Sequence, residues 1–384
     1  QSKNDNPLFK AFINSASEAG HTVNPDMNGE EQEGFGMFDT TIHEGQRASA
    51  TKYYLNPAKK RKNLKIVTRA HVKNIEFENN KAIAVNYWIN KNLIKAKANT
   101  EIILSAGSIG SPHILQASGV GPGNLLKKYN INIVKEHPFV GKNLHDHLML
   151  RPVYKVKNIY TLNKLYHSYF EKIKAGLNFF FFRRGPLTMG ASQLCGFTKS
   201  DENLATPNLQ YHVAPMSTDK LGGAALHNFP AFTPTITNIR PTSRGHIELG
   251  GADTRIDPKI FMNYLSSEED KKIAVKAIKI TRKIVLESEA FKPYEPEEMR
   301  PGINLSDDEI VTEVGKYANT IFHPVGTCKM GNDDMAVVDD SLKVKGVQNL
   351  RVIDASIMPN ITSGNTNAPT IMIAEKGADM ILNG

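Results

Sequence analysis

Leu350-Arg-Val-Ile-Asp-Ala-Ser356, followed by Ser363-Gly-Asn-Thr-Asn-Ala-Pro369, is the stretch that decides the fold of this 384-residue chain. Its apolar run at 350–353 is typical of a buried strand, and apolar residues at helical spacing follow the polar turn. Pro369 suits the start of that helix, because a helix start leaves N–H groups unpaired and proline lacks one. Such starts attract anions, phosphate among them. The stretch predicts a nucleotide-binding corner, with a plain buried strand–helix unit as the alternative.

A histidine and an amide flank this corner. His323 lies in Phe322-His-Pro-Val-Gly-Thr327, before the apolar run, and Asn367 lies in the turn after it. A strand, a turn and a helix start can bring the two side chains together, where a base and an amide can jointly hold the oxygen of an alcohol. On the residues alone, a helix-start or core histidine is the alternative for His323.

Further motifs give the chain a family resemblance. The text from His323 to Gly331, the run from Asn349 to Pro359 and Gly364-Asn-Thr-Asn-Ala-Pro-Thr370 resemble the C-terminal part of glucose–methanol–choline (GMC) oxidoreductases. Gly107-Ser-Ile-Gly-Ser-Pro-His-Ile-Leu-Gln-Ala-Ser-Gly-Val-Gly-Pro122 resembles the internal signature of that family. Smaller matches are Val140-Gly-Lys-Asn-Leu-His-Asp-His147 and the run from Arg240 to Leu249. The wording is most similar to bacterial choline dehydrogenase-like and alcohol dehydrogenase-like members.

The resemblance implies a mixed α+β or α/β fold with two parts. One part is a partial FAD-binding, GMC-type domain, and the other is a substrate domain with an antiparallel sheet backed by helices. We expect the partial FAD-binding domain at 1–149, with the internal signature at 107–122. The substrate domain follows at 150–317, and 318–384 returns to the FAD-binding domain with the catalytic pair.

Hydrophobic patterning predicts individual elements within these parts. Alternating or continuous apolar runs separated by polar turns predict short strands, and apolar residues at helical spacing predict a helix. The predicted strands are 64–67, 72–77, 82–88, 101–105, 209–213, 246–249 and 350–353, and the predicted helix is 268–286.

One expected motif is absent. Family members open with a strand, a Gly-x-Gly-x-x-Gly turn and a helix that hold the ADP part of FAD. The nearest string here is Gly119-Val-Gly-Pro-Gly-Asn124, which has asparagine in place of the third glycine. We therefore expect the chain to be the C-terminal portion of a longer protein that lacks this N-terminal segment. A non-catalytic remnant or binding module that does not hold FAD by itself is then the alternative to an enzyme.

The resemblance implies FAD-dependent oxidation of a primary alcohol, choline-like or another small alcohol, to the aldehyde. A hydride leaves the carbon more readily as the hydroxyl oxygen loses its proton, so a base with a pKa near neutrality is useful. His323 is expected to be that base and Asn367 the group that binds the oxygen. The enzyme is expected to be a dehydrogenase, with a quinone or another compound as electron acceptor.

The resemblance also implies residues that bind FAD. Val72 is expected at the adenine end, and Asp354 and Ala355 at the flavin side. The turn and the helix start are expected to add Asn365, Pro369 and Thr370.

Composition narrows the kinds of partner and cellular compartment that the chain is expected to have. Basic residues exceed acidic ones, 47 to 39, but they are spread along the chain, which favours a solvated basic surface over a nucleic-acid partner. Two cysteines make a disulfide framework improbable and favour a reducing compartment.

No apolar run reaches membrane-spanning length. Phe179-Phe-Phe-Phe182 is either a membrane-surface contact or a buried or lid-like segment. We expect a location in the cytoplasm or peripheral to the inner membrane.

His145-Asp146-His147 invites a metal hypothesis, because imidazole and carboxylate are good metal ligands. The same residues belong to a family phrase that needs no metal, so no metal site is predicted.

Overall fold

The computed structural model describes residues 6–188, 190, 192–220 and 225–383. It divides into two compact units, each made of three segments of the chain. Unit 1 contains residues 1–65, 148–239 and 268–319, and unit 2 contains residues 66–147, 240–267 and 320–384. This division differs from the predicted boundaries at two places. Residues 1–65 join the unit expected to begin at 150, and 240–267 join the other unit.

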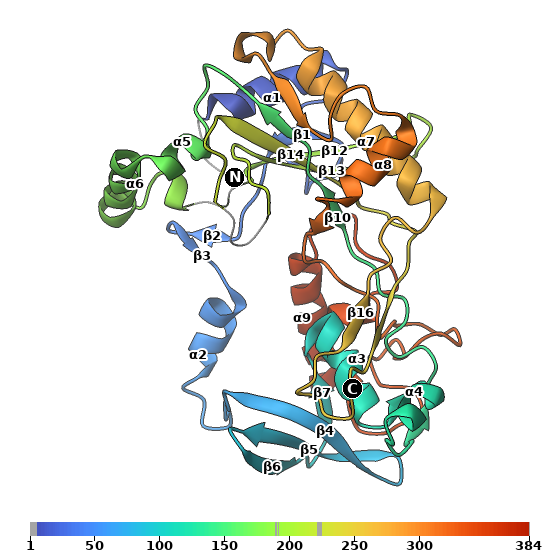
Figure 1. The fold of residues 1–384 in the computed structure, drawn as a ribbon. Coiled ribbons are helices and arrows are strands. Elements are labelled where there is room, and N and C mark those ends of the chain that lie inside the picture. The colour runs from blue at the N-terminus through green and yellow to red at the C-terminus, as the bar shows by residue number, and fades with distance from the viewer. Residues whose placement is uncertain (1–5, 189, 191, 221–224, 384) are drawn as a thin grey trace. The chain divides into compact units, whose positions relative to one another are not determined.

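Unit 1 is built on an antiparallel sheet backed by helices (Figure 1), as predicted. Its main strands run in the order β1-β12-β13-β14-β10, and β11 joins β14 to β17. The strands are β1 (Gly34–Met37), β10 (Leu148–Leu150), β11 (Val153–Lys155), β12 (Leu194–Thr198), β13 (Leu209–Ala214), β14 (Ala231–Asn238) and β17 (Glu297–Arg300), with a separate hairpin of β2 (Ile42–His43) and β3 (Gln46–Arg47).

The helices of unit 1 begin where the sequence provides caps and charges. Asn6 caps the first helix and Pro7 follows it, while three acidic residues open the helix that starts at Glu268, where they complement the helix dipole. The helices are α1 (Pro7–Glu18), α2 (Asn56–Ala58), α5 (Leu162–His167), α6 (Tyr169–Phe182), α7 (Glu268–Leu286) and α8 (Asp307–Gly315), with shorter turns η1 (Thr51–Leu55), η2 (Pro186–Thr188) and η3 (Lys292–Tyr294).

An aromatic cluster joins α1 and the segment that follows α7 to the sheet. The Phe12 ring centroid lies 6.0 to 6.4 Å from those of Phe35, Tyr211, Phe232 and Phe291, and all five rings are buried. Burial of aromatic side chains of this size is a main source of domain stability. The cluster shows why residues before position 65 belong to unit 1.

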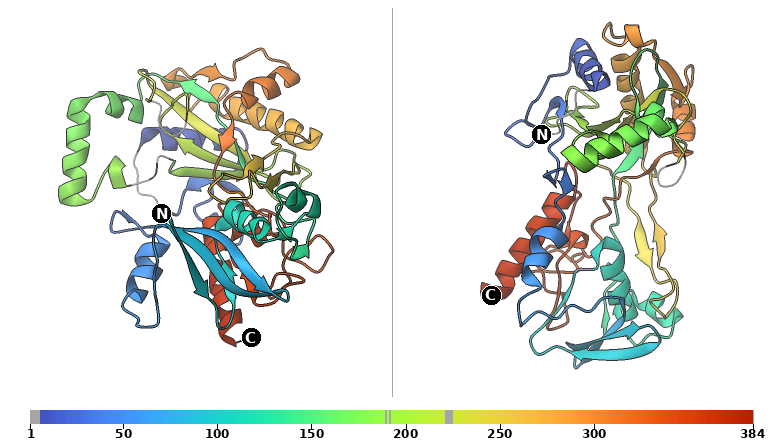
Figure 2. Two further views of the ribbon diagram at one scale, coloured as in Figure 1. Left: turned by 60° about the horizontal axis from the view of Figure 1, so that its bottom comes forward. Right: turned by 90° about the vertical axis from the view of Figure 1, so that its left-hand side faces the viewer.

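Unit 2 is centred on two parallel strands, β7 (Ile102–Leu104) and β19 (Leu350–Val352), which pair in register. Its core draws on both ends of the sequence, from Ile75 to Ile373. An antiparallel three-stranded layer lies at one end of this unit (Figure 2). The remaining elements are β4 (Ala70–Glu78), β5 (Lys81–Ile89), β6 (Asn92–Lys97), α3 (Gly107–Ala117), β8 (Val120–Gly121), α4 (Gly123–Lys128), β9 (Lys135–Glu136), β15 (His246–Glu248), β16 (Lys259–Phe261), η4 (Ala355–Ile357) and α9 (Asn367–Asn383); β18 (Asn319–Thr320) spans the two units.

Most predicted elements are confirmed. The predicted helix at 268–286 is α7, and the predicted strand at 350–353 is β19, one residue shorter. The strand predicted at 64–67 is wrong, because these residues have no strand assignment and lie exposed where the chain leaves unit 1. The last helix begins at Asn367, so Pro369 is its third residue and not its first. Among the described residues, no helix is long and apolar enough to cross a membrane.

Candidate active site

His323 lies in unit 2, in the loop that follows β18. Its side chain is buried, and its backbone N–H donates to Asp146 Oδ1 at 2.9 Å. The residue before it, Phe322, has a φ of 64°, a backbone conformation that bulky residues rarely adopt. The loop is therefore held in a specific conformation by the Asp146 carboxylate and not by a helix or a strand.

The two ring nitrogens of His323 face different partners. Nδ1 lies 3.1 Å from Nδ1 of His147, and the two rings meet edge to face. Nε2 lies 3.4 Å from the side-chain amide nitrogen of Asn365. An amide N–H donates, so a hydrogen bond from Asn365 to Nε2 requires the tautomer with the proton on Nδ1, toward His147. The neutral tautomer leaves the Nε2 lone pair available to accept a proton.

Asp146 is a buried carboxylate that accepts four hydrogen bonds. Oδ1 accepts from the backbone N–H groups of His147 (2.8 Å) and His323 (2.9 Å). Oδ2 accepts from the hydroxyls of Tyr264 (2.5 Å) and Thr320. The residue is 3% exposed. One side chain thus fixes both histidines and draws the loop at 320–323 against the segment that carries Tyr264.

Burial controls the charge of this cluster. It lowers the pKa of His323 below its ordinary 6.5, while the negative charge of Asp146 acts in the opposite direction. Burial also raises the pKa of Tyr264, and Asp146 adds to that effect. His323 is therefore neutral at pH 7. When its ring takes up a proton, the nearby negative charge of Asp146 stabilises the charged form.

Asn367 does not reach this cluster. It is exposed, it is the first residue of α9, and no hydrogen bond joins it to His323 in the described part of the chain. Asn365, predicted as a cofactor residue, occupies the position next to His323 that the sequence reasoning assigned to Asn367. The two asparagines alternate along an irregular turn and both are exposed, and no signal in the sequence shows which of them contacts His323.

A second polar cluster lies where β7 and β19 end. Asp354 follows β19, and its Oδ2 accepts from the Gly107 N–H (2.9 Å) and the Ser111 hydroxyl (2.6 Å) at the start of α3. Its Oδ1 accepts from the N–H of Ser356 (2.8 Å) in η4. Gly107 has a φ of 78°, and a Cβ there would meet no atom within 4 Å. The turn thus requires glycine, and the space beside it is open.

The other predicted cofactor residues lie in unit 2 as well. Val72 is half-buried in β4, and its carbonyl accepts the Thr254 hydroxyl at 2.7 Å. Ala355 is half-buried in η4, which packs against both α3 and α9. Pro369 and Thr370 belong to the first turn of α9, and Thr370 N–H donates to Thr366 O at 3.0 Å. Their contacts with a cofactor stay predictions.

The side chains of the His145-Asp146-His147 motif already have hydrogen-bond partners. Nδ1 of His145 lies 2.6 Å from the Asn143 carbonyl, and its Nε2 accepts the N–H of Ile361 at 2.9 Å. Burial, then the charge of Arg244, lowers the pKa of His145 to about 4. Across the described residues, no group of three such side chains has metal-binding geometry.

Neither cysteine is suited to this chemistry, although Cys328 lies close to Asp354 and Ser356. Cys195 and Cys328 are both buried and free, and burial raises the pKa of each thiol. A buried thiol with a raised pKa is a poor nucleophile.

Sequence reasoning missed the roles of three residues in the active-site cluster. Asp146 and His147 were read as members of a metal-like motif. Tyr264 carried no local signal, because its partner Asp146 lies 118 positions away in the sequence.

Comparison with known proteins identifies the family. A model described as GMC oxidoreductase, N-terminal part, matches residues 1–149, and the C-terminal GMC oxidoreductase model matches residues 241–374. The chain is 43% identical to an oxygen-dependent choline dehydrogenase from Proteus mirabilis over 99% of its own length and 68% of that protein. It is 40% identical to the one from Brucella anthropi, over 99% and 69%. This chain belongs to the GMC oxidoreductase family.

Solved structures agree with the fold of this GMC oxidoreductase. The chain resembles pyridoxine 4-oxidase from Mesorbium loti with a TM-score of 0.86 at 26% identity, over 100% of this chain and 71% of that one. It resembles a formate oxidase with a TM-score of 0.90 at 26% identity, over 98% and 70%. The mixed fold with FAD-binding and substrate parts is therefore confirmed.

One expectation about this GMC oxidoreductase is wrong. The chain was expected to be the C-terminal portion of a family member that lacks the N-terminal dinucleotide-binding segment, yet the N-terminal family model matches residues 1–149. The absence of one glycine-rich string was a poor guide, because the N-terminal family model matches this range without it.

FAD is the cofactor of this GMC oxidoreductase, and its substrates carry a CH–OH group. The corner at Asp354 fits a dinucleotide. Two parallel strands end at one edge, where α3 and η4 begin, and helix starts in that position bind phosphate groups. The Ser108 hydroxyl in the first turn of α3 is buried and makes no hydrogen bond within the described chain. Such an unpaired donor suits a ligand oxygen.

Proposed function

We propose that this chain oxidises choline or a choline-like small primary alcohol to the aldehyde, with His323 as the base and Asn365 as the amide that binds the substrate oxygen. The observation that carries the proposal is the orientation of His323. Its Nδ1 is turned to His147, while its Nε2 has only a long contact with the amide of Asn365. A hydroxyl group that replaces this contact meets an acceptor for its proton at Nε2 and a donor for its oxygen at the amide.

The protein groups prepare the alcohol for oxidation. FAD, when bound, accepts the hydride that leaves the carbon. His323 must be neutral to take the hydroxyl proton, and its burial keeps it neutral. The Asp146 carboxylate then stabilises the imidazolium that forms, without itself taking the proton. The Asn365 amide holds the oxygen as its negative charge develops, which is the electrostatic role of a preorganised donor.

The choice of Asn365 over Asn367 rests on geometry. Both asparagines are exposed, but Asn365 contacts the histidine that takes the proton, whereas Asn367 is the first residue of α9. We assign the first of the two asparagines to the substrate and leave Asn367 a role at the helix start.

Choline is the substrate we propose because relatives named choline dehydrogenases are 40–43% identical over nearly the whole chain. For the electron acceptor we propose a quinone or another compound, and we propose that the enzyme is a dehydrogenase. We also propose that the enzyme works in the cytoplasm or at the periphery of the inner membrane.

The test uses the protein loaded with FAD, under anaerobic conditions. Bleaching of the flavin band in a single turnover isolates the reductive half of the reaction from the acceptor. The panel contains choline, its uncharged isostere 3,3-dimethylbutanol, benzyl alcohol and pyridoxine. We expect choline to bleach the flavin fastest. Bleaching by another alcohol but not by choline would contradict the substrate assignment and leave the base assignment intact. Oxygen and a soluble quinone are then added separately to the reduced protein to identify the acceptor.

A further inference from the structure

Helix α6 in unit 1 presents an apolar face to solvent. Seven of its large apolar side chains are between 54% and 84% exposed, and of its residues only Ala175 is fully buried. The helix stands clear of the sheet of unit 1 and has α5 and η2 as neighbours (Figures 1 and 2). The exposed side chains are Tyr169, Phe170, Ile173, Leu177, Phe180, Phe181 and Phe182.

These side chains form a stripe at helical spacing, which we call the α6 stripe. Positions 169, 170, 173, 177, 180 and 181 recur every three or four residues, so they lie along one side of the helix. On an ordinary surface helix this pattern faces the core. Here it is exposed, and a contiguous exposed apolar surface of this kind marks an interaction site.

Basic residues border the α6 stripe. The segment 160–190 contains five basic residues and a single acidic one, Glu171. The ammonium of Lys172 lies 4.8 Å from the Tyr166 ring centroid, and the guanidinium of Arg183 lies 4.8 Å from that of Phe179. The basic residues are Lys164, Lys172, Lys174, Arg183 and Arg184. The stripe thus combines aromatic side chains with positive charge.

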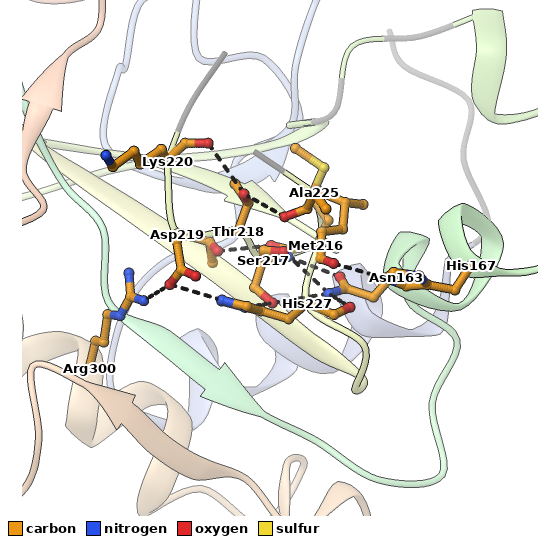
Figure 3. Close-up of polar contacts among 12 residues, drawn as sticks. Asn163, His167, Met216, Ser217, Thr218, Asp219, Lys220, Ala225, His227 and Arg300 are labelled. Carbon is orange, nitrogen blue, oxygen red and sulfur yellow. Dashed lines mark hydrogen bonds and ion pairs between the residues drawn. The ribbon is translucent and has the colours of Figure 1, made fainter. Parts of the chain in front are cut away.

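The helix next to the stripe is firmly attached to unit 1. Asn163 in α5 is buried, and its amide donates to Ser217 O and Oγ and to the His227 carbonyl, while its oxygen accepts from Ser217 N–H (Figure 3). One turn later in α5, His167 Nε2 lies 2.8 Å from the Leu226 carbonyl oxygen. Because α5 is fixed at this end, α6 is presented by a fixed support.

The polar network behind α5 is not itself a second active site. Ser217, His227 and Asp219 are arranged like a nucleophile, a base and an acid, with distances of 2.9 Å and 3.1 Å (Figure 3). Ser217 is 1% exposed and already bonded to Asn163, so its hydroxyl is closed to a substrate. The network acts as a structural clamp for α5.

We propose that the α6 stripe docks on the surface of an anionic phospholipid bilayer, with its aromatic and aliphatic side chains in the headgroup layer and its basic residues against lipid phosphates. Aromatic and basic residues on one helix are the chemistry of interfacial helices. With 14 residues, α6 is too short to cross a bilayer, so the contact is with the surface. A second copy of the chain is a poorer occupant, because a two-fold contact would bring like charges together.

The experiment measures sedimentation of the full chain with vesicles of phosphatidylglycerol and phosphatidylcholine, and with vesicles of phosphatidylcholine alone. One variant carries Ile173→Glu and Phe181→Glu in the stripe, and a second carries Arg183→Gln and Arg184→Gln. The matched controls are Leu93→Glu, at an exposed apolar position on β6, and Lys59→Gln with Lys60→Gln, at exposed basic positions. Circular dichroism establishes that every variant is folded.

We expect binding to the anionic vesicles that weakens with salt. Each stripe or arginine variant should bind at least roughly tenfold more weakly, since each basic residue near an anionic surface contributes about fivefold. The controls should bind as the unchanged chain does. Failure of the unchanged chain to bind anionic vesicles, or equal binding by all variants, would overturn the proposal. So would a dimer in sedimentation velocity that the stripe variant abolishes, because a second copy would then cover the stripe. The outcome does not depend on the substrate or on catalysis.

Discussion

Two histidine clusters in this chain contain similar residues but have different uses. In unit 1, both ring nitrogens of His227 are occupied, Nδ1 by the Ser217 hydroxyl at 2.9 Å and Nε2 by Asp219 at 3.1 Å. In unit 2, His323 is held through its backbone and its Nδ1, and Nε2 keeps only a 3.4 Å contact. A histidine whose nitrogens are both satisfied supports structure. A histidine with one nitrogen left available can take part in chemistry.

The carboxylates of the two clusters differ in the same way. Asp146 is buried and accepts four hydrogen bonds within unit 2. Asp219 has a side chain that is 63% exposed and pairs with Arg300 and His227. These two pairings lower the pKa of Asp219, His227 first. Exposed ion pairs contribute little to the free energy of unfolding. Loss of a buried acceptor, in contrast, leaves each of its donors unpaired and destabilises the fold.

The largest expected effect is on stability. Asp146→Ala leaves two backbone N–H groups and two hydroxyls without their acceptor, at about 1–3 kcal/mol for each buried donor left unpaired. We expect the free energy of unfolding in urea to fall by at least about 3 kcal/mol. Asp219→Ala is the matched control and should change it by no more than about 1 kcal/mol. Equal losses for the two variants would remove the distinction between the clusters.

The next effect separates the two asparagines. Asn365→Ala removes the amide beside His323 Nε2, and we expect flavin reduction by alcohol to slow by about 10- to 100-fold. Asn367→Ala, two residues away at the start of α9, should reduce flavin within about threefold of the unchanged rate. Anaerobic stopped-flow absorbance measures both. A larger loss in Asn367→Ala would return the role to the residue that the sequence alone suggested.

A third effect concerns the clamp behind α5. Asn163→Ala removes a buried amide that bonds to Ser217 and the His227 carbonyl, so we expect a loss of about 1–3 kcal/mol in unfolding free energy. The rate of flavin reduction in the folded variant should be unchanged, because the cluster has no role in proton transfer. Thermal unfolding and stopped-flow reduction on the same sample give both values. A slow but stable variant would show that the two clusters are not separate in function.

The smallest effect is a shift in pH dependence. Burial lowers the pKa of His323, so the rate of flavin reduction should fall as the pH drops through a value below 6.5, where the base becomes protonated. Asp146 opposes that shift, and Asp146→Asn removes its charge while keeping one acceptor oxygen. The midpoint should therefore move to still lower pH in this variant. A midpoint that moves upward would contradict the assigned electrostatics.

The sequence predicted the elements better than the site. Helix 268–286 and strand 350–353 were visible because their apolar residues recur at the spacing of one structure. The strand at 64–67 failed because β-type composition does not ensure a partner strand. His323 was found through its motif, but Asn365 was not separated from Asn367, since an irregular turn has no periodicity. The Asp146–Tyr264 hydrogen bond joins residues 118 positions apart, a distance at which local pattern carries no information.

The most direct test of the account compares His323→Ala with His227→Ala in FAD-loaded protein. Both variants are mixed with choline under anaerobic conditions, and flavin bleaching is followed in a single turnover. We expect His323→Ala to retain its flavin and to bleach about 10²- to 10⁴-fold more slowly, as for the loss of a general base. His227→Ala should bleach at the unchanged rate. Bleaching at the unchanged rate in His323→Ala would remove this histidine from the mechanism and contradict the central claim.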